Sequence, residues 1–417
     1  MFDLDNWQEI AAVLKANKLR TFLTAFGVFW GIFMLMVMLG FGSSMQTATR
    51  RQMKGMATNL LFIWGMPTTK AFDGLPPGRF VQFKTDDIEL IRGLPGVEWV
   101  APRIQLGGWM NNFNVSYEGK TGSFNVFGDY PDLRHIVAFQ YQGGRFINER
   151  DIAENRKVAV IGDAVRNELI PADVEPIGKY IKLSGVYFQV VGVTSSLGQG
   201  QRGDRDAHTV FVPFTTMKSA FHTGDNVGFF AMTAKPGVDG PELERQVRAA
   251  LYRQHRVDPS DELAIGSFNL FVFFDKLETV FSVLYWLSWV VGGSTLAAGA
   301  IGVMNIMLIT VRERTKEFGV RKALGAKPST VIAMVVKETI TLTALAGLIG
   351  ITFGTFVLWA AGKGLEKAPN APFGPPELAF STVLWAVGVL VAAGALAGIL
   401  PAANAAAIKP VEALRAE

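Results

Sequence analysis

The chain has 417 residues, enough for two or three folding units, and 49% of them are apolar. The mean hydropathy is positive, so membrane segments are expected. Because the chain contains no cysteine, disulfides, thiol catalysis and thiolate metal sites are excluded. The net charge of +4 is small, and the basic residues lie beside apolar runs, which is typical of membrane flanks and not of a nucleic-acid surface.

Four uncharged stretches are long enough to cross a bilayer as helices, which takes about 20 residues each. We expect transmembrane segments at residues 21–42, 279–311, 329–362 and 378–405; in the third, Lys337 and Glu338 lie near the cytoplasmic end and the uncharged stretch follows them. The second run is longer than a bilayer requires, and we expect its first part, around Val280 to Trp289, to continue beyond the membrane as a stalk. The first segment is typical of an uncleaved signal anchor, although Gly42-Ser43-Ser44 leaves cleavage as an alternative.

Basic residues flanking these segments predict their orientation. They are concentrated before the first segment, in residues 312–328 and after the fourth segment. By the positive-inside rule, these three regions are cytoplasmic, and residues 43–278 and the loop 363–377 lie outside. The protein is therefore expected in the cell membrane with both termini in the cytoplasm.

The two ends of the chain are expected to remain at the cytoplasmic membrane surface. Residues 1–20 alternate apolar and polar side chains with a helical period, which predicts an amphipathic helix in contact with membrane lipids. Residues 406–417 follow the fourth segment as a short cytoplasmic tail.

Small residues recur every four positions in the second and third segments. The ones that carry this pattern are Ser294, Ala298, Gly302, Gly350 and Gly354. Such spacing lets helix backbones approach closely. Two interpretations stay open, namely packing within the chain and an interface between two permease chains.

Residues 43–278 contain alternating short strand and helix patterns. Strands are predicted at residues 60–64, 97–101, 157–161, 180–183, 187–193 and 228–234. Helices are predicted from Thr85–Asp87 to Gly93, at 163–169 and at 241–252. This order indicates an α+β domain with two lobes, so the fold class is an α-helical membrane protein with four transmembrane helices plus an α+β extracytoplasmic domain.

The stretch from Ser195 to His208 is rich in glycine and polar residues, and its composition predicts a mobile surface loop. A second interpretation is a contact with an extracytoplasmic partner through Gly198, Gln199, Gln201 and Arg202. The four histidines of the chain are scattered without metal-ligand spacing. We therefore expect no catalytic, metal or cofactor site.

Residues 312–328 form a short loop that is dense in both signs of charge. A positive-inside anchor explains the basic residues but not Glu313 and Glu317. A short helix with both charges, ended by Gly325, can dock into a cleft on a soluble partner. The residues expected to take part are Arg312, Glu313, Arg314, Thr315, Glu317, Gly319, Arg321, Lys322 and Gly325.

This loop resembles the signature of MacB/FtsX-type ABC permeases. The resemblance rests on Asn305-Ile306-Met307 followed by the run from Glu313 to Ala326, with weaker similarity over nearly the whole chain. Asn404 departs from the family pattern, where a basic residue is common. The sequence has no G-x-x-x-x-G-K-[ST] motif, so the ATPase is expected to be a separate chain that binds ATP and Mg.

The resemblance implies a non-catalytic membrane subunit with a MacB-like periplasmic core domain and an FtsX-like domain. Its implied partners are a dimer of ABC ATPase subunits, a second permease (the same chain or a paralogue), and in some systems a periplasmic adaptor and an outer-membrane duct. Three outputs stay open: export of a periplasmic or membrane-associated substrate, release of a lipoprotein or lipid, and FtsX-like signalling to a cell-wall enzyme.

Overall fold

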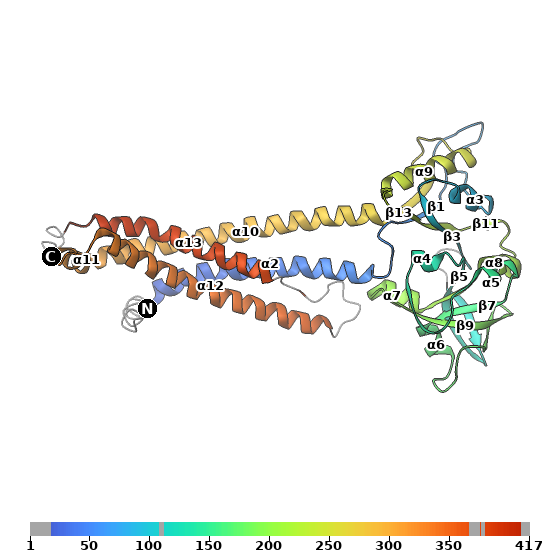
Figure 1. Cartoon of the computed structure of the whole chain (residues 1–417), viewed down its shortest axis with the longest axis horizontal. Coiled ribbons are helices and arrows are strands. Elements are labelled where there is room, and N and C mark those ends of the chain that lie inside the picture. Colours follow the sequence, from blue (N-terminus) through green and yellow to red (C-terminus); the bar gives the residue numbers. More distant parts are fainter. Residues whose placement is uncertain (1–17, 108–111, 367–375, 377–379, 410–417) are drawn as a thin grey trace. The chain divides into compact units, whose positions relative to one another are not determined.

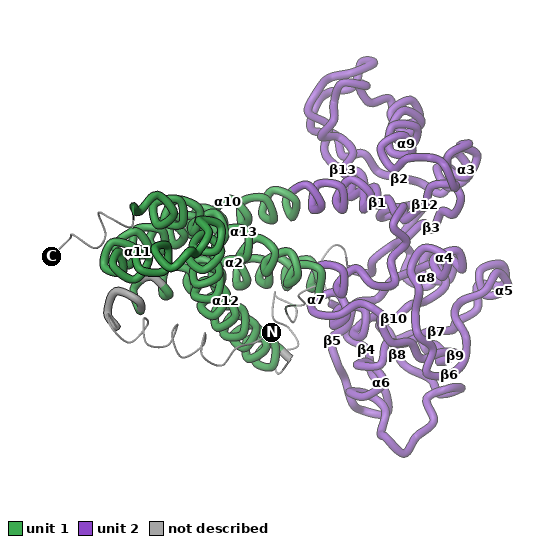
Figure 2. Tube along the Cα trace, turned by 60° about the vertical axis from the view of Figure 1, so that its left-hand side comes forward, with its two compact units in different colours: residues 1–48, 280–417 green, residues 49–279 purple. Residues whose placement is uncertain are grey.

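The computed structural model describes residues 18–107, 112–366, 376 and 380–409. The chain divides into two compact units, one of residues 1–48 and 280–417 and the other of residues 49–279, which Figure 2 shows in different colours. Most of the expected amphipathic helix 1–20, most of the loop 363–377 and most of the tail 406–417 lie outside the described residues.

Within the described residues, the first unit consists of long helices and a short one (Figure 1). They are α2 (Lys18–Gln52), α10 (Leu270–Glu313), α11 (Thr315–Ala323), α12 (Pro328–Glu366) and α13 (Phe380–Ala407). Within the described residues, all of these except α11 contain a stretch long and apolar enough to cross a membrane. The prediction of four transmembrane helices is confirmed.

Helices α2 and α10 are both longer than a bilayer requires. They have 35 and 44 residues, which corresponds to about 50 and 65 Å at 1.5 Å per residue, against a hydrocarbon core of about 30 Å. The expected stalk, Val280 to Trp289, lies inside α10. Helix α2 also extends beyond its predicted membrane segment: the segment was expected to end at Gly42, and the helix ends at Gln52.

All strands of the described chain lie in the second unit. They are β1 (Leu60–Gly65), β2 (Phe83–Lys84), β3 (Val97–Gln105), β4 (Phe113–Tyr117), β5 (Lys120–Asp129), β6 (Phe139–Gly144), β7 (Val158–Gly162), β8 (Tyr180–Leu183), β9 (Val186–Ser196), β10 (Thr209–Pro213), β11 (Asn226–Val227), β12 (Phe229–Ala234) and β13 (Ile265–Asn269). The helices are α3 (Asp86–Arg92), α4 (Leu133–Ile136), α5 (Glu149–Ala153), α6 (Asp163–Leu169), α7 (Gly200–Ala207), α8 (Phe214–Phe221) and α9 (Gly240–Gln254).

Strand β3 joins two lobes of this unit. Its residues 97–103 pair with β12, which continues through β1 to β13 in an antiparallel sheet with α3 and α9. Its last residues, Ile104 and Gln105, pair with β5 of the other lobe. There, β10, β7, β9, β8, β4 and β5 follow one another, and β10 also pairs with β5, so the six strands close into a ring. The expected two-lobed α+β domain is present.

The predicted strands and helices of this domain are found with their boundaries within a few residues. The elements that were not predicted include the strands β2, β4, β5, β6, β10, β11 and β13 and the helices α4, α5 and α8. The prediction of an irregular loop from Ser195 to His208 is wrong, because Gly200–Ala207 forms α7. Its two glycines disfavour a helix by about 1 kcal/mol each. Tertiary hydrogen bonds offset this cost: Ser196 donates to Asp206 at 2.8 Å, and Arg202 donates to the carbonyl oxygens of Gln52 and Lys54 at 3.3 and 3.2 Å.

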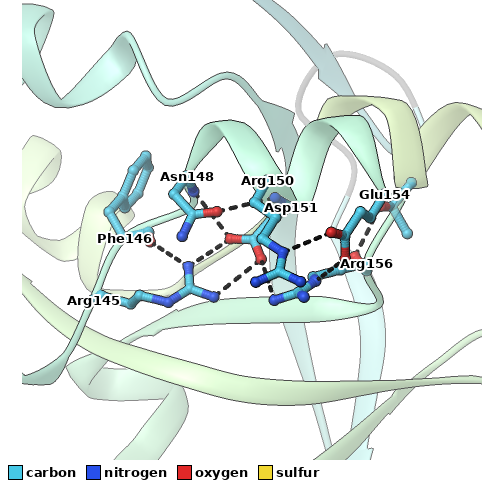
Figure 3. A network of polar contacts seen from close by, with 8 residues as sticks. Arg145, Phe146, Asn148, Arg150, Asp151, Glu154 and Arg156 are labelled. Carbon is cyan, nitrogen blue, oxygen red and sulfur yellow. Dashed lines mark hydrogen bonds and ion pairs between the residues drawn. The ribbon is translucent and has the colours of Figure 1, made fainter.

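A buried carboxylate fixes the start of α5 (Figure 3). The Asn148 side chain accepts from the amide of Asp151, and the Asp151 carboxylate accepts from the amide of Asn148, both at 3.0 Å, which makes a capping box. Asp151 has no exposed side-chain surface and accepts two bonds from Arg145, at 2.5 and 3.0 Å. Arg156 lies 4.0 Å from Asp151 and pairs with Glu154 at 2.8 Å.

We predict that Asp151→Asn lowers the thermal unfolding midpoint of the extracytoplasmic domain by about 4–12 °C. Loss of charge-assisted hydrogen bonds to a buried group costs about 2–3 kcal/mol, and each kcal/mol shifts Tm by about 2–4 °C in a domain of this size. Circular dichroism of the full chain in detergent measures the midpoint. Glu154→Gln is the control, because Glu154 is 46% exposed and its loss should change Tm by no more than about 2 °C. Equal midpoints for both variants would contradict the assignment.

Candidate functional site

The short helix α11 packs against the membrane helices through its inner face. Phe318 is 1% exposed and belongs to the same buried apolar cluster as Val311 of α10 and Val331 of α12, and Gly319 beside it is also buried. Gly325, with a φ of +98°, follows the helix and allows the chain to turn toward α12. A nine-residue helix is marginal alone, so its stability depends on this packing.

Arg314 connects α11 to α12 by ion pairs. It lies between α10 and α11 and donates to both oxygens of Glu317, at 2.7 and 2.8 Å. Its remaining terminal nitrogen lies 3.2 Å from Glu338 of α12. Glu317 also pairs with Arg321 at 2.9 Å. The hydrogen bonds from Arg314, followed by the nearby positive charges, lower the pKa of Glu317, so this carboxylate stays ionised at neutral pH.

The end of α11 contacts two other helices. The ammonium of Lys322 donates to the carbonyl oxygens of Ala406 and Ile408 at the end of α13, both at 2.7 Å. A cation is favourable at this position because the last carbonyls of a helix carry partial negative charge. Arg321 lies 2.7 Å from the sulfur of Met334 on α12. The helix therefore holds contacts with α12 and α13 in addition to its chain connection to α10.

The residues expected to dock a partner are thus divided between two faces. Arg314, Arg321 and Lys322 contact the membrane helices and Gly319 is buried, whereas Glu317 pairs with Arg314 and Arg321. Arg312, Glu313 and Gly325 are exposed. Thr315 is half-buried and donates back to Arg312 at 2.7 Å.

Sequence reasoning missed two exposed apolar residues, Val320 and Leu324. They are 44% and 83% exposed and lie one turn apart. An exposed leucine by itself is ordinary. The signal available in the sequence was the spacing, because residues four apart share one helix face and Phe318 occupies the other. The outer face of α11 therefore combines an apolar patch with flanking charges.

The small residues of the membrane helices also fall into two groups. A Cβ on Gly350 would lie 2.8 Å from the carbonyl oxygen of Phe29, and one on Gly354 would lie 3.0 Å from Met36, so both glycines of α12 pack against α2. By contrast, Ser294 and Ala298 of α10 are exposed, and a Cβ on Gly302 would meet no atom within 4 Å.

In the segment before and inside α7, Gly198 is buried and Arg202 is 20% exposed, whereas Gln199 and Gln201 are exposed. Within the part of the chain that the structure describes, no three histidine, aspartate or glutamate side chains come together as metal ligands.

The comparisons with known proteins agree with this architecture. A family profile described as the MacB-like periplasmic core domain matches residues 21–250, and one described as the FtsX-like permease C-terminal domain matches residues 289–410. The chain belongs to the MacB/FtsX family of permeases. It is an ABC transporter permease, a membrane protein with an extracytoplasmic domain.

Two relatives illustrate the similarity. A pyoverdine export ATP-binding/permease protein, PvdT, from Pseudomonas putida is 30% identical over 415 residues, which cover 99% of this chain and 60% of the relative. A macrolide export ATP-binding/permease protein, MacB, from Bdellovibrio bacteriovorus is 29% identical over 406 residues, with 97% and 60% covered. The chain thus spans about 60% of the length of these relatives. The crystal structure of the periplasmic region of MacB from Actinobacillus actinomycetemcomitans covers 54% of this chain and 95% of its own, at 16% identity and a TM-score of 0.43.

We predict that Phe318→Ala releases α11 from the helices it packs on. Removing a buried phenylalanine costs about 3–5 kcal/mol, so hydrogen exchange of the amides in residues 315–323 should accelerate at least tenfold. Val320→Ala, on the exposed face, is the control and should leave exchange unchanged. Equal exchange in both variants would show that the inner face does not hold the helix.

Proposed function

We propose that this chain is the transmembrane permease subunit of an ABC complex in which a separate ATPase drives movement of the extracytoplasmic domain. That movement exports or extrudes a periplasmic or membrane-associated substrate. The supporting observation is α11, a short helix fixed on its inner face by Phe318 and Arg314 and exposed on its outer face at Val320 and Leu324. This chain supplies no nucleotide chemistry in the proposal, since ATP and Mg bind to the ATPase.

The contacts of α11 provide a route for force. Arg314 is the only residue between α10 and α11, and it also reaches Glu338 of α12. Lys322 reaches the end of α13. A displacement of α11 by the ATPase therefore acts on three membrane helices together. Helix α10 then continues without interruption to Leu270, directly after β13, which pairs with β1.

The middle of each membrane segment is uncharged. The sequence has no Asp, Glu, Lys or Arg between Arg20 and Arg50, between Glu278 and Arg312, between Glu338 and Lys363, or between Glu377 and Lys409. Transport pathways through a bilayer usually contain such residues. This supports transmission of movement across the membrane in preference to passage of the substrate through it.

The proposed complex contains two ATPase subunits and a second permease. Ser294 and Ala298 of α10 are exposed, and a Cβ on the half-buried Gly302 would meet no atom within 4 Å. We assign this row to the second permease, which is either the same chain or a paralogue. An adaptor and an outer-membrane duct would complete an exporter. Release of a lipoprotein or lipid, or signalling to a cell-wall enzyme, would use the same force route, and the neighbouring genes distinguish these outputs.

We predict that Leu324→Ser weakens binding of the ATPase about tenfold or more, because burial of a leucine contributes about 1.5–3 kcal/mol. Co-purification with the ATPase and stimulation of its activity measure the effect. The double variant Glu313→Ala, Arg321→Ala should also uncouple the ATPase, while its insertion into the membrane persists. The matched control is Leu263→Ser, at a leucine that is 69% exposed in the extracytoplasmic domain. If Leu324→Ser binds and stimulates the ATPase like the wild type, the docking surface is assigned wrongly.

We also predict the orientation of the two units across the membrane. Because the chain has no cysteine, one introduced cysteine reports one site. Ser184→Cys, in the exposed turn between β8 and β9, should react with a membrane-impermeant maleimide on intact spheroplasts. Lys316→Cys, exposed on α11, should react only after permeabilisation. The opposite pattern would refute the proposed orientation.

A further inference from the structure

A cavity of about 370 Å³ lies inside the unit formed by residues 49–279. Its wall includes residues of β1, β12 and β13 from one lobe and of β5, β6, β10 and α7 from the other. Residues of α4 and of β3, the strand that joins the lobes, also contribute. Small-molecule sites in proteins have volumes of about 300–1,000 Å³. The cavity is therefore large enough for a compact organic ligand and small for a lipid with two acyl chains.

Nearly half of the residues that line the cavity are aromatic. They include Phe62, Trp64, Phe127, Phe211, Phe229 and Phe268. Phe229 makes edge contacts with Phe62 at 6.0 Å and with Phe127 at 6.3 Å between ring centroids. Such contacts restrict the rings to a fixed arrangement, so they form a preformed apolar surface against which a ligand body can pack.

The polar part of the wall is dominated by arginine. Arg103, Arg202 and Arg205 all line the cavity. The guanidinium of Arg103 lies 4.5 Å from the centroid of Phe127 and pairs with the fully buried Asp129 at 2.5 and 3.0 Å. Asp129 therefore fixes Arg103 in place and neutralises it.

The charged side chains at this wall include more cations than anions. Arg202 has Asp206 as an ion-pair partner at 3.6 Å, and Arg103, Arg202 and Arg205 lie near the two carboxylates of Asp129 and Asp206. Burial lowers the pKa of Arg205, and the charge of Arg103 lowers it further; burial also lowers the pKa of Arg202. Removal of water from clustered positive charges is unfavourable, and an anion among them would relieve that cost.

We propose that this cavity binds a small amphiphilic anion, with an apolar body against the aromatic rings and one carboxylate, sulfonate or phosphate head among Arg103, Arg202 and Arg205. Cationic ligands are disfavoured by the arginines, and purely apolar ligands make no hydrogen bond to them. The assignment rests on the cavity alone and holds whether or not the chain couples to an ATPase.

The test uses the full chain in nanodiscs of zwitterionic phosphatidylcholine and equilibrium dialysis of radiolabelled decanoate, with decanol as the uncharged match. Uptake by empty nanodiscs is subtracted to remove partition into lipid. We expect saturable binding of one decanoate per chain, and at least tenfold weaker binding of decanol, because hydrogen bonds to charged groups are strong. Absence of saturable binding above empty nanodiscs would overturn the proposal.

Three variants locate the site. Arg205→Gln should weaken decanoate about tenfold and leave decanol unchanged, and Met56→Trp should weaken both by filling the cavity. Arg166→Gln, on α6 outside the cavity wall, is the control and should bind like the wild type. Arg205→Lys keeps the charge and should retain most of the binding, which separates a binding role from a folding role. Unchanged decanoate binding by Arg205→Gln, or an equal loss of both probes, would contradict the assignment.

The same anionic head could also come from a membrane lipid. Nanodiscs that contain phosphatidylglycerol distinguish the two sources. Because the cavity is small, we expect the decanoate affinity to be unchanged in these nanodiscs. Competition by phosphatidylglycerol would assign the cavity to a membrane lipid and overturn the proposal of a compact free ligand.

Discussion

The contact on which the proposed mechanism depends is the packing of one nine-residue helix, α11, onto the ends of the membrane helices. Such a helix cannot persist by its own hydrogen bonds, because helix formation has a costly first turn. The buried ring of Phe318 and the link from Arg314 to Glu317 and Glu338 provide the missing stabilisation. The same contacts prevent α11 from moving independently, and a partner that displaces it therefore acts on the helices beneath.

The bilayer imposes a second constraint, on the continuity of the membrane helices. Backbone amides in lipid must be paired within the segment, so each crossing is a continuous helix. The two units are divided at residues 48/49 and 279/280, and both positions lie inside helices, α2 and α10 respectively. At both positions the chain is helical, with α2 running from Lys18 to Gln52 and α10 from Leu270 to Glu313.

Local patterns in the sequence were sufficient for the membrane helices, for the charged helix α11 and for strands such as β7, because each is specified by a run of consecutive residues. The strands β4 and β5 and the ring they complete depend on pairing between distant segments, which no local pattern contains. The direction of Lys322 toward α13 likewise depends on tertiary packing. The cavity could not be predicted either, because its wall is formed by residues far apart in the sequence, from Met56 to Phe268.

The segment predicted wrongly as a loop is also the one that supplies arginines to the cavity. Helix α7 forms because its polar groups bond elsewhere, and two of those bonds reach the last turn of α2: Arg202 donates to the carbonyl of Gln52, and the amide of Gln199 donates to that of Arg51. An anion held by Arg202 and a displacement of α2 therefore act on the same hydrogen bonds. If movement of α2 changes the affinity of the cavity for the anion, then by thermodynamic linkage the bound anion shifts the position of α2 by the same coupling free energy.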